Sequence, residues 1–395
     1  MTSLDAELNQ RLATLREQNL FRALRRVDSA QGPRIEIGGK SFLNFSSNDY
    51  LGLANHPALQ EAAIKAVEKF GAGAGASRLI CGSLAPFHEL EEALAAFKKT
   101  EAALTFSTGF AAALGTITAL VGKDDVIILD KLVHACIVDA AKLSRAKLRI
   151  FDHNDLNDLE DKLKWARANT KGQVLVVTES VFSMDGDHAH LTEIVALKEK
   201  YGAWLMVDEA HATGLYGKHR RGLAEECAVS EYVEIQMGTL GKALGASGGY
   251  ICGSRTMIDY LVNRARSFIF STAPVPATAG AAVAGITILQ TEEGKSLHAN
   301  LWQRIRMFHS LNRAVHLPNS AILPFMIWDE ERALSISSEL RDKGFFVPAI
   351  RYPTVARRSA RLRITLTASH TECDVVELAK MLSPIAEQIS CLRDA

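Results

Sequence analysis

The stretch Gln173–His211 reads "QVLVVTESVFSMDGDHAHLTEIVALKEKYGAWLMVDEAH" and holds one complete strand–helix–strand pattern. Its two ends, QVLVVTES and WLMVDEAH, are short runs of mostly apolar residues, and a segment of helical length, Leu191–Tyr201, lies between them. Because these runs are continuously apolar and do not alternate, they indicate strands that are buried on both faces. Two such strands joined through a helix predict an α/β fold with a mainly parallel central sheet.

The same pattern continues on both sides of this stretch. Further strand-like runs and helical segments follow the same rule: Val126–Asp130, Val233–Leu240, Gly248–Ser254, His134–Leu143 and Leu156–Ala168. After about Leu289, charged helices flank the runs Ala321–Trp328 and Arg361–Thr367, which suggests a smaller α+β domain. We therefore predict an N-terminal helix and strand segment over residues 1–45, a large domain over 46–288 and a small C-terminal α+β domain over 289–395.

Composition limits the classes of function. The chain has 395 residues, 48% hydrophobic and 23% charged, which is typical of a globular protein with a substantial core. A formal net charge of zero argues against partners such as nucleic acid or an anionic membrane. The six cysteines contain no C-x-x-C pair, and the N-terminus has no signal-like apolar run. The apolar run Ala273–Leu289 contains two prolines and predicts a buried helix, so we expect a cytoplasmic protein.

Polar residues gather where the predicted strands end. In parallel sheets the carboxyl ends of the strands meet along one edge, where ligands bind. Three predicted strand ends bring chemically useful side chains to that edge: Glu179 and Ser183, Asp208 with His211, and Thr239 with Lys242.

The lysine in "MGTLGKALGASGGY", Met237–Tyr250, first suggests a phosphate-binding loop. Its spacing fails, because Gln236 stands where the first glycine of that motif belongs and Ala243 follows Lys242. Lys242 is then either a surface lysine on a turn or a reactive amine in a cavity. Asp208 taken alone is equally well explained as a helix N-cap.

Thr108 and Gly109 begin a helical segment whose free N–H groups make an anion site. An anion site, a buried aspartate and a lysine around one crevice fit pyridoxal 5'-phosphate. The helix start would hold the phosphate, Asp208 would keep the ring nitrogen protonated, and Lys242 would form the Schiff base.

Two other segments leave their roles open. The segment "DHAH", Asp187–His190, lacks a third ligand at metal-binding spacing, and we predict no metal there. The basic run Arg351–Arg363 is either a solvated loop or a site that captures a carboxylate or phosphate.

Seven motifs together resemble the α-oxoamine synthases, which are fold-type I pyridoxal-phosphate enzymes with an aspartate aminotransferase-like fold. They are NFSSNDYLGL (Asn44–Leu53), SRLICGS (Ser77–Ser83), STGFAA (from Ser107), VFSMDGD (Val181–Asp187), VDEAH (Val207–His211), GTLGKALGASGG (from Gly238) and AIRYPTV…ARLRITLTASH (Ala349–His370). The resemblance runs in order from about Arg25 to the last helix.

The resemblance implies a role for each matching residue. Lys242 forms the internal Schiff base and moves the α-proton, Asp208 pairs with the pyridinium nitrogen, and His211 bonds the ring hydroxyl. His134 stacks on the ring and also meets substrate. The remaining cofactor contacts would be Gly109, Phe110, Ser183, Thr239 and Thr272, and the remaining substrate contacts Arg25, Arg351 and Thr354.

The resemblance also implies the reaction and its partners. The C-terminal motif, Ala349–His370, resembles most the family members that condense L-alanine with a pimeloyl thioester. The thioester is carried by coenzyme A or acyl carrier protein. Glycine C-acetyltransferase, which uses glycine and acetyl-CoA, is the nearest alternative, and another α-oxoamine synthase is a second one. A catalytically silent cofactor-binding or dimerisation module is a further one. The segment Phe270–Pro274, with Thr272, resembles one that reaches a neighbour's cofactor phosphate, so we expect a homodimer with shared active sites.

Overall fold

The computed structural model describes residues 2–312 and 317–393, and it divides the chain into two compact units. The larger unit is Asn48–Leu301, and the smaller one combines Met1–Ser47 with Trp302–Ala395. Met1 and residues 394–395, at the ends of the predicted terminal domains, lie outside the described residues. The predicted boundaries near residues 45 and 288 stay predictions.

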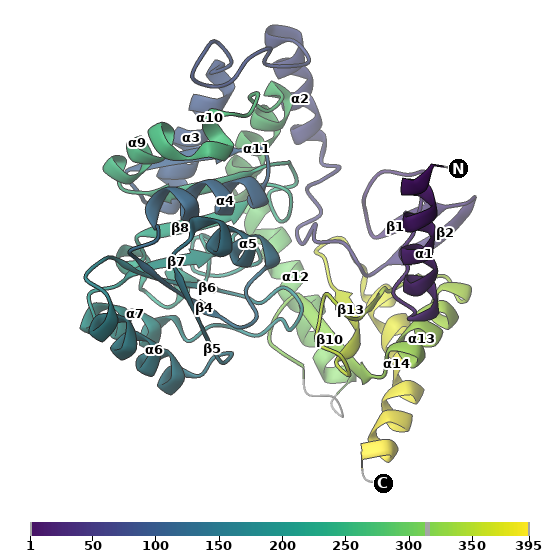
Figure 1. The fold of residues 1–395 in the computed structure, drawn as a ribbon. Coiled ribbons are helices and arrows are strands. Elements are labelled where there is room, and N and C mark those ends of the chain that lie inside the picture. The colour runs from purple at the N-terminus through teal and green to yellow at the C-terminus, as the bar shows by residue number, and fades with distance from the viewer. Residues whose placement is uncertain (1, 313–316, 394–395) are drawn as a thin grey trace. The chain divides into compact units, whose positions relative to one another are not determined.

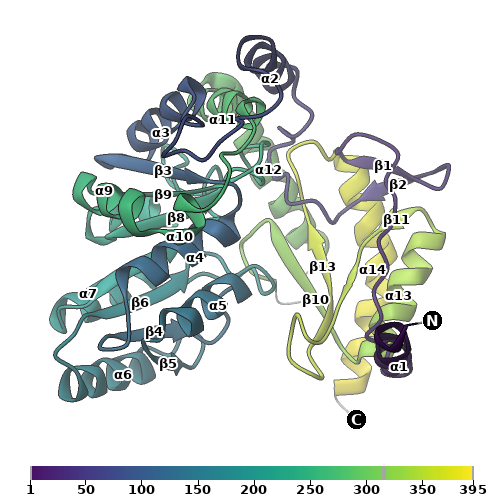
Figure 2. The same cartoon turned by 45° about the horizontal axis from the view of Figure 1, so that its top comes forward.

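The larger unit is built around a seven-stranded sheet of order β3-β9-β8-β7-β6-β4-β5 (Figures 1 and 2). The bounds of its strands are β3 (Ala102–Phe106), β4 (Val126–Asp130), β5 (Lys147–Phe151), β6 (Val174–Glu179), β7 (Trp204–Asp208), β8 (Ile235–Thr239) and β9 (Gly249–Gly253). Every pairing among β5, β4, β6, β7 and β8 is parallel, whereas β9 runs antiparallel to both β8 and β3. The predicted mainly parallel sheet is therefore confirmed.

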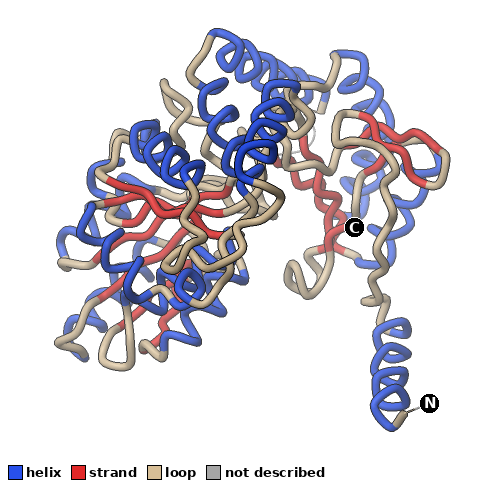
Figure 3. The backbone as a smooth tube through the Cα atoms, turned by 90° about the horizontal axis from the view of Figure 1, so that it is seen from above, coloured by secondary structure: helices blue, strands red, loops and turns tan. Residues whose placement is uncertain are grey.

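Helices cover both faces of this sheet, as Figure 3 shows for the strands in red. Their bounds are α2 (Pro57–Phe70), α3 (Ala85–Lys98), α4 (Gly109–Leu120), α5 (Ala135–Ser144), α6 (Leu156–Asn169), α7 (Leu191–Lys200), α8 (Leu223–Glu226), α9 (Arg255–Arg264), α10 (Arg266–Ile269) and α11 (Pro276–Leu289), with a 3-10 turn at Ser230–Tyr232. Side chains of α4, α5, α9 and α10 form one hydrophobic core with one face of the strands. Burial on two faces explains why β4 and β6 are buried at every residue.

Local sequence signals fix the ends of these helices. Asp155 caps α6 by accepting hydrogen bonds from the backbone N–H groups of Asn157 and Asp158. Thr108 caps α4 in the same way, by accepting from the N–H of Ala111. Each cap follows a strand directly or after a short turn, so the helix starts are held against the carboxyl end of the sheet.

The smaller unit contains two three-stranded sheets, β1-β2-β11 and β10-β13-β12 (Figure 2). Its elements are α1 (Ser3–Glu17), β1 (Arg34–Ile37), β2 (Lys40–Asn44), β10 (Ile322–Trp328), α13 (Glu330–Asp342), β11 (Phe345–Phe346), β12 (Ala349–Ile350), β13 (Ala360–Thr365) and α14 (Glu372–Arg393), with α12 (Glu292–Leu311) beginning in the larger unit. The N-terminal strand β2 pairs in parallel with β11, which joins the two ends of the chain into one unit.

No helix of the described residues is both long enough and apolar enough to cross a membrane. The apolar run after Ala273 forms α11, in which Ala279, Ala282 and Leu289 are buried.

Candidate active site

The carboxyl ends of three neighbouring strands meet at one small pocket. Glu179 is the last residue of β6 and Asp208 the last of β7, and the two are paired in register. Thr239 ends β8, and Lys242 follows it in the next turn. The pocket, about 210 Å³ in volume and here called the Lys242 pocket, is lined by Gly109, Phe110, His134, Cys136, Glu179, Asp208, Ala210, His211, Met237, Thr239 and Lys242.

Two glycines allow the backbone to close around this pocket. Gly245 has a φ of +66°, and a Cβ added there would lie 2.5 Å from the carbonyl carbon of Leu53. At Gly249 an added Cβ would lie 2.6 Å from Cα of Gly109, at the start of α4. A side chain at Gly245 would clash with Leu53, and one at Gly249, in β9, would clash with the start of α4, which explains the glycines after Lys242.

The amine of Lys242 contacts His211 directly. Its Nζ lies 2.9 Å from Nε2 of His211, and Nδ1 of the same ring lies 2.5 Å from the hydroxyl of Tyr50. The sequence did not single out Tyr50, although it belongs to the NFSSNDYLGL motif. A hydrogen-bonding neighbour on each side fixes the orientation of the His211 ring.

Two carboxyl groups lie side by side at the floor of the pocket. Burial raises the pKa of Asp208, and the nearby charge of Lys242 opposes that rise. The Oδ1 atom of Asp208 accepts a hydrogen bond of 2.9 Å from the backbone N–H of Ala210. Burial, and then the charge of Asp208, raise the pKa of Glu179 to about 8. The raised pKa of Glu179 therefore favours its protonated form at neutral pH.

His134 caps α5, and this fixes its tautomer. Its Nδ1 atom accepts a hydrogen bond of 3.2 Å from the backbone N–H of Cys136, whose Sγ lies 3.0 Å from the same atom. Burial lowers the pKa of His134; the charge of Asp208 opposes this shift, and the charge of Lys242 adds to it. A neutral ring with its proton on Nε2 follows, which suits stacking on an aromatic cofactor better than acid catalysis.

Buried polar atoms without hydrogen-bond partners indicate which ligand the Lys242 pocket can bind. Among the described residues, Oγ1 of Thr239 and Oε1 of Glu179 are buried and have no hydrogen-bond partner. Buried polar atoms of this kind usually meet a ligand or water. The first N–H groups of α4, at Gly109 and Phe110, lie in the same lining and favour an anion. A phosphorylated cofactor with an aldehyde for Lys242 and a ring nitrogen for Asp208 fits this set of donors.

The structure brings seven of the predicted site residues together in the lining: Lys242, Asp208, His211, His134, Gly109, Phe110 and Thr239. Ser183 lies next to it, and its backbone N–H donates to Oε2 of Glu179 at 3.2 Å. Thr272 is exposed and forms an isolated bridge with Ser77. The sequence predicted no role for the lining residues Cys136, Ala210 and Met237, or for Glu179, which it noticed only as a strand end.

The predicted substrate residues Arg25, Arg351 and Thr354 belong to the smaller unit. The guanidinium group of Arg351 donates to the backbone carbonyls of Asn19 and Phe21 at 2.7 and 3.2 Å. Arg22 donates to the hydroxyl of Thr354 at 3.0 Å, whereas the guanidinium carbon of Arg25 lies 5.9 Å from the ring centre of Phe346. Arg22 therefore contacts Thr354, and the role of Arg25 in binding substrate stays a prediction.

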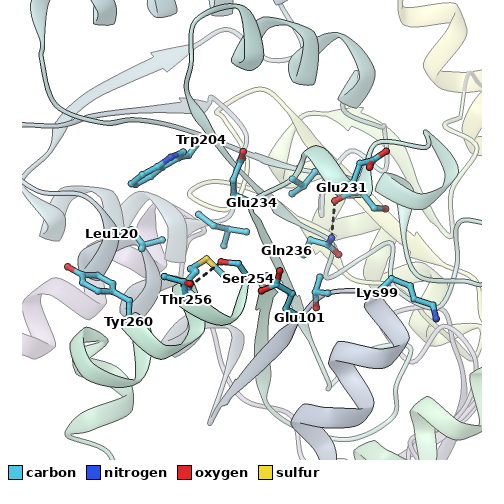
Figure 4. Close-up of a pocket in the computed structure, with 16 residues that line it drawn as sticks. Lys99, Glu101, Leu120, Trp204, Glu231, Glu234, Gln236, Ser254, Thr256 and Tyr260 are labelled. Atoms are coloured by element: carbon cyan, nitrogen blue, oxygen red, sulfur yellow. Dashed lines mark hydrogen bonds between the residues drawn. The ribbon is translucent and has the colours of Figure 1, made fainter.

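A second and larger cavity, of about 800 Å³, lies at the opposite end of the same strands (Figure 4). Figure 4 shows Leu120, Trp204 and Tyr260 grouped on one side of it, with Lys99 and Glu231 on the other. We call it the amino-end cavity, because Trp204 and Ile235 begin strands β7 and β8. Its carboxylate Glu234 already accepts hydrogen bonds from Nζ of Lys198 and the N–H of Leu205, at 2.6 and 2.8 Å.

Comparison with known proteins agrees with this geometry. The family described as "Aminotransferase class I and II" matches residues 40–382. Among curated proteins, the 8-amino-7-oxononanoate synthase of Geotalea daltonii is 46% identical over 384 residues, covering 96% of this chain and 98% of the relative. The enzyme of the same name from Geobacter sulfurreducens is 45% identical, with 98% of each chain covered.

A solved structure extends the likeness to the whole fold. Serine palmitoyltransferase from S. paucimobilis, solved with a bound PLP–myriocin aldimine, superposes with a TM-score of 0.91 at 29% identity. The match covers 99% of this chain and 100% of the other. The predicted fold class, that of the aspartate aminotransferase-like transferases of fold-type I, is confirmed.

Proposed function

The chain belongs to the aminotransferase class I and II family, and from that premise we propose that it is a pyridoxal-phosphate-dependent acyltransferase. It condenses L-alanine with a pimeloyl thioester, carried by coenzyme A or acyl carrier protein. The products are 8-amino-7-oxononanoate, carbon dioxide and the free thiol carrier, in a step of biotin biosynthesis. The observation that carries this proposal is the agreement between the donor set of the Lys242 pocket and the relatives named above.

Bound pyridoxal phosphate supplies an electron sink that stabilises negative charge at the α-carbon of the amino acid. Five residues of this chain would hold it. The N–H groups of Gly109 and Phe110 and the free Oγ1 of Thr239 suit the phosphate. The carboxylate of Asp208 suits the ring nitrogen, whose positive charge would lower the pKa that burial raises. Lys242 would hold the aldehyde carbon covalently.

The remaining roles concern substrate and protons. We assign to the amine of Lys242 the removal and return of the α-proton, because it is the basic group in the pocket lining that contacts His211. His134, held neutral, packs over the ring. Arg25, Arg351 and Thr354 bind the substrate, where a guanidinium fork matches a carboxylate.

The assembly and location of the protein are part of the same proposal. We propose a homodimer in which Thr272 reaches the partner's cofactor phosphate and Ser183 is a further cofactor contact. The exposure of Thr272 supports that role, since its side chain is accessible to a second chain. A cytoplasmic location fits the scattered cysteines and the absence of a membrane-crossing helix in the described part of the chain.

A two-way substrate panel tests the proposed function. The purified protein, loaded with pyridoxal phosphate, is offered alanine, glycine or serine with acetyl, pimeloyl or palmitoyl thioesters. Mass spectrometry then identifies the amino ketone formed. We expect alanine with the pimeloyl thioester to give the highest kcat/KM, by at least about tenfold. Preference for glycine with the acetyl thioester would instead assign glycine C-acetyltransferase activity.

A further inference from the structure

A histidine lies between two aspartates at the carboxyl end of the large sheet. Nδ1 of His153 lies 2.9 Å from Oδ1 of Asp130, and its Nε2 lies 2.7 Å from Oδ2 of Asp187. Asp130 is the last residue of β4, His153 follows β5, and Asp187 begins the DHAH segment whose role the sequence left open. None of the three lines the Lys242 pocket, so the proposed function gives them no role.

The geometry of this cluster determines the protons on His153. An ionised carboxylate only accepts hydrogen bonds, and each ring nitrogen of His153 faces one. A neutral ring would turn a lone pair toward one of the two carboxylates, so the ring is an imidazolium with a proton on each nitrogen. Burial lowers the pKa of His153, but the hydrogen bonds to Asp130 and Asp187 and their charges outweigh it and raise the pKa to about 10.

Asp130 anchors one side of the cluster in the core. Its side chain is 1% exposed, and every residue of β4 is buried. Its Oδ1 also accepts a hydrogen bond from the backbone N–H of Leu132 at 2.8 Å, and its Oδ2 accepts one from the N–H of Asn154 at 3.1 Å. The imidazolium therefore binds to a carboxylate whose position is fixed.

Asp187 lies on a hairpin that carries Ser183. An isolated antiparallel bridge joins the two ends of this hairpin, Val181–His188, here called the Ser183 hairpin. Within it, the N–H of Phe182 donates to the carbonyl of Asp187 at 3.0 Å. The ring of Phe182, which is 0% exposed, meets the ring of His153 edge-on with centroids 4.4 Å apart. His153 thus holds the hairpin by packing as well as by charge.

The Ser183 hairpin continues from β6 into the proposed cofactor site. The N–H of Ser183 donates to Oε2 of Glu179 at 3.2 Å, and Glu179 lines the Lys242 pocket. On the other side, Oδ1 of Asp187 is buried and has no hydrogen-bond partner among the described residues. The imidazolium is thus the cation that compensates the charge of Asp187.

We propose that His153 and Asp187 are positioning residues, and that the imidazolium ties the Ser183 hairpin to the end of β4 and so holds Ser183 and Glu179 in place for the cofactor. No atom of the Asp130–His153–Asp187 contacts is one that the proposed cofactor would engage, so these contacts persist when it binds. The effect on cofactor binding rests on the proposed function. The charge of His153 and the order of the hairpin do not.

The first test measures the charge on His153. The full chain, labelled with 15N-histidine, is studied by NMR, and His153 is assigned by the loss of its signals in His153→Gln. Both ring nitrogens should carry protons at pH 8, where a histidine of ordinary pKa is neutral. Asp187→Ala should lower the pKa of His153 by about one to three pH units, because it removes one of the two carboxylates.

The second test measures the hairpin and its effect on the cofactor. In cofactor-free Asp187→Ala, the amides of the Ser183 hairpin should exchange with D2O at least about fivefold faster than in the wild type, the effect of one hydrogen bond to a charged group. The dissociation constant for pyridoxal phosphate, measured by fluorescence titration, should rise by at least about fivefold. With saturating cofactor, the KM for L-alanine should stay within about twofold, because the variant changes cofactor binding and not the predicted substrate residues.

Two variants serve as controls. Asp187→Asn keeps an oxygen that accepts from Nε2–H, so it should lower the pKa of His153 yet leave hairpin exchange and cofactor affinity within about threefold of wild type. Asp152→Ala removes a carboxylate next to His153 in sequence, but one that pairs with exposed Lys131 at 2.9 Å. It should leave hairpin exchange and cofactor affinity within about twofold of wild type.

Three results would overturn the proposal. A neutral His153 in the wild type at pH 8 would do so without any variant, and therefore also if Asp187→Ala does not fold. In folded Asp187→Ala, hairpin exchange within twofold of wild type would contradict the tie, and an unchanged dissociation constant would contradict its effect on the cofactor. A wild-type protein that binds no pyridoxal phosphate would count against the proposed function and leave the NMR and hairpin-exchange results standing.

Discussion

The two ends of the parallel sheet carry very different cavities. The amino-end cavity has a volume of about 800 Å³, against about 210 Å³ for the Lys242 pocket. Two of its carboxylates are already bonded: Glu234 accepts from Lys198, and Glu101 accepts from the backbone N–H of Arg255. The smaller pocket contains buried polar atoms without partners among the described residues, on Thr239 and Glu179. Unsatisfied buried groups, and not size, distinguish the candidate site, because such groups are costly unless a ligand meets them.

Replacing one lysine in each cavity should give the largest difference in turnover between two variants. Lys242→Ala should lower turnover by at least about 10³-fold, because it removes the group that both holds the cofactor and moves the proton. Lys99→Ala, in the amino-end cavity, should change turnover less than about twofold. Steady-state kinetics measures both, and circular dichroism checks folding. Comparable losses in the two variants would contradict the assignment of the site to the carboxyl end.

Two adjacent carboxylates at the end of β7, Asp208 and Glu209, should differ in their effects on activity and stability. Asp208 faces the Lys242 pocket, whereas Glu209 turns away and forms a buried ion pair with Lys98. Asp208→Asn should lower turnover by about 10²- to 10³-fold with little loss of stability, since it relieves a buried charge. Glu209→Gln should destabilise the fold by about 3–5 kcal/mol, because Lys98 stays buried and charged.

Urea denaturation and kinetics on the same two variants check this second prediction. The expected result is a crossing pattern, with stability lost in one variant and activity in the other. A parallel loss of both properties in both variants would show that the two carboxyl groups do not have separate roles.

Ionisation of Glu179 should change the free energy of unfolding by a smaller amount that depends on pH. Its pKa is raised from an ordinary value of 4.5 to about 8 by burial. The folded chain therefore binds this proton more tightly than the unfolded chain, and the associated stability is present below pH 4.5 and lost as the pH rises through about 8. The effect is at most about 1.4 kcal/mol per pKa unit. Urea denaturation of the cofactor-free chain at several pH values measures it.

Glu179→Gln is the reference for that titration, because it keeps the shape and cannot ionise. The stability of the wild type relative to this variant should fall between pH 5 and 9. A difference that stays constant over this range would mean that Glu179 ionises normally, and that Asp208 does not share its pocket with a neutral acid.

Much of the fold was predictable from the sequence, for a physical reason. Strands β4, β6 and β7 are buried on both faces and therefore read as continuous apolar runs. The edge strand β5 was missed, because Lys147 and Ile150 are exposed and its sequence KLRIF mixes charged and apolar residues. The antiparallel direction of β9 was also not predicted, since it depends on pairing with β8 and β3.

The candidate site was predictable where it lies at strand ends. Asp208, Thr239 and Lys242 follow apolar runs, so the topology of a parallel sheet was enough to bring them together. Tyr50 was missed because it comes from a loop far away in sequence, and only its contact with His211 reveals it. Cys136 was missed because it enters the lining only through the cap at the start of α5. Contacts of this kind depend on tertiary packing, which no local pattern encodes.

The most direct test of the central claim is to locate the lysine that holds the cofactor. The protein loaded with pyridoxal phosphate is treated with borohydride, which fixes the cofactor to its lysine, and is then digested and mapped by mass spectrometry. The account predicts one modified residue, Lys242, in the peptide that contains GTLGKALGASGGY. Modification at Lys99 or another lysine, with Lys242 unmodified, would contradict it.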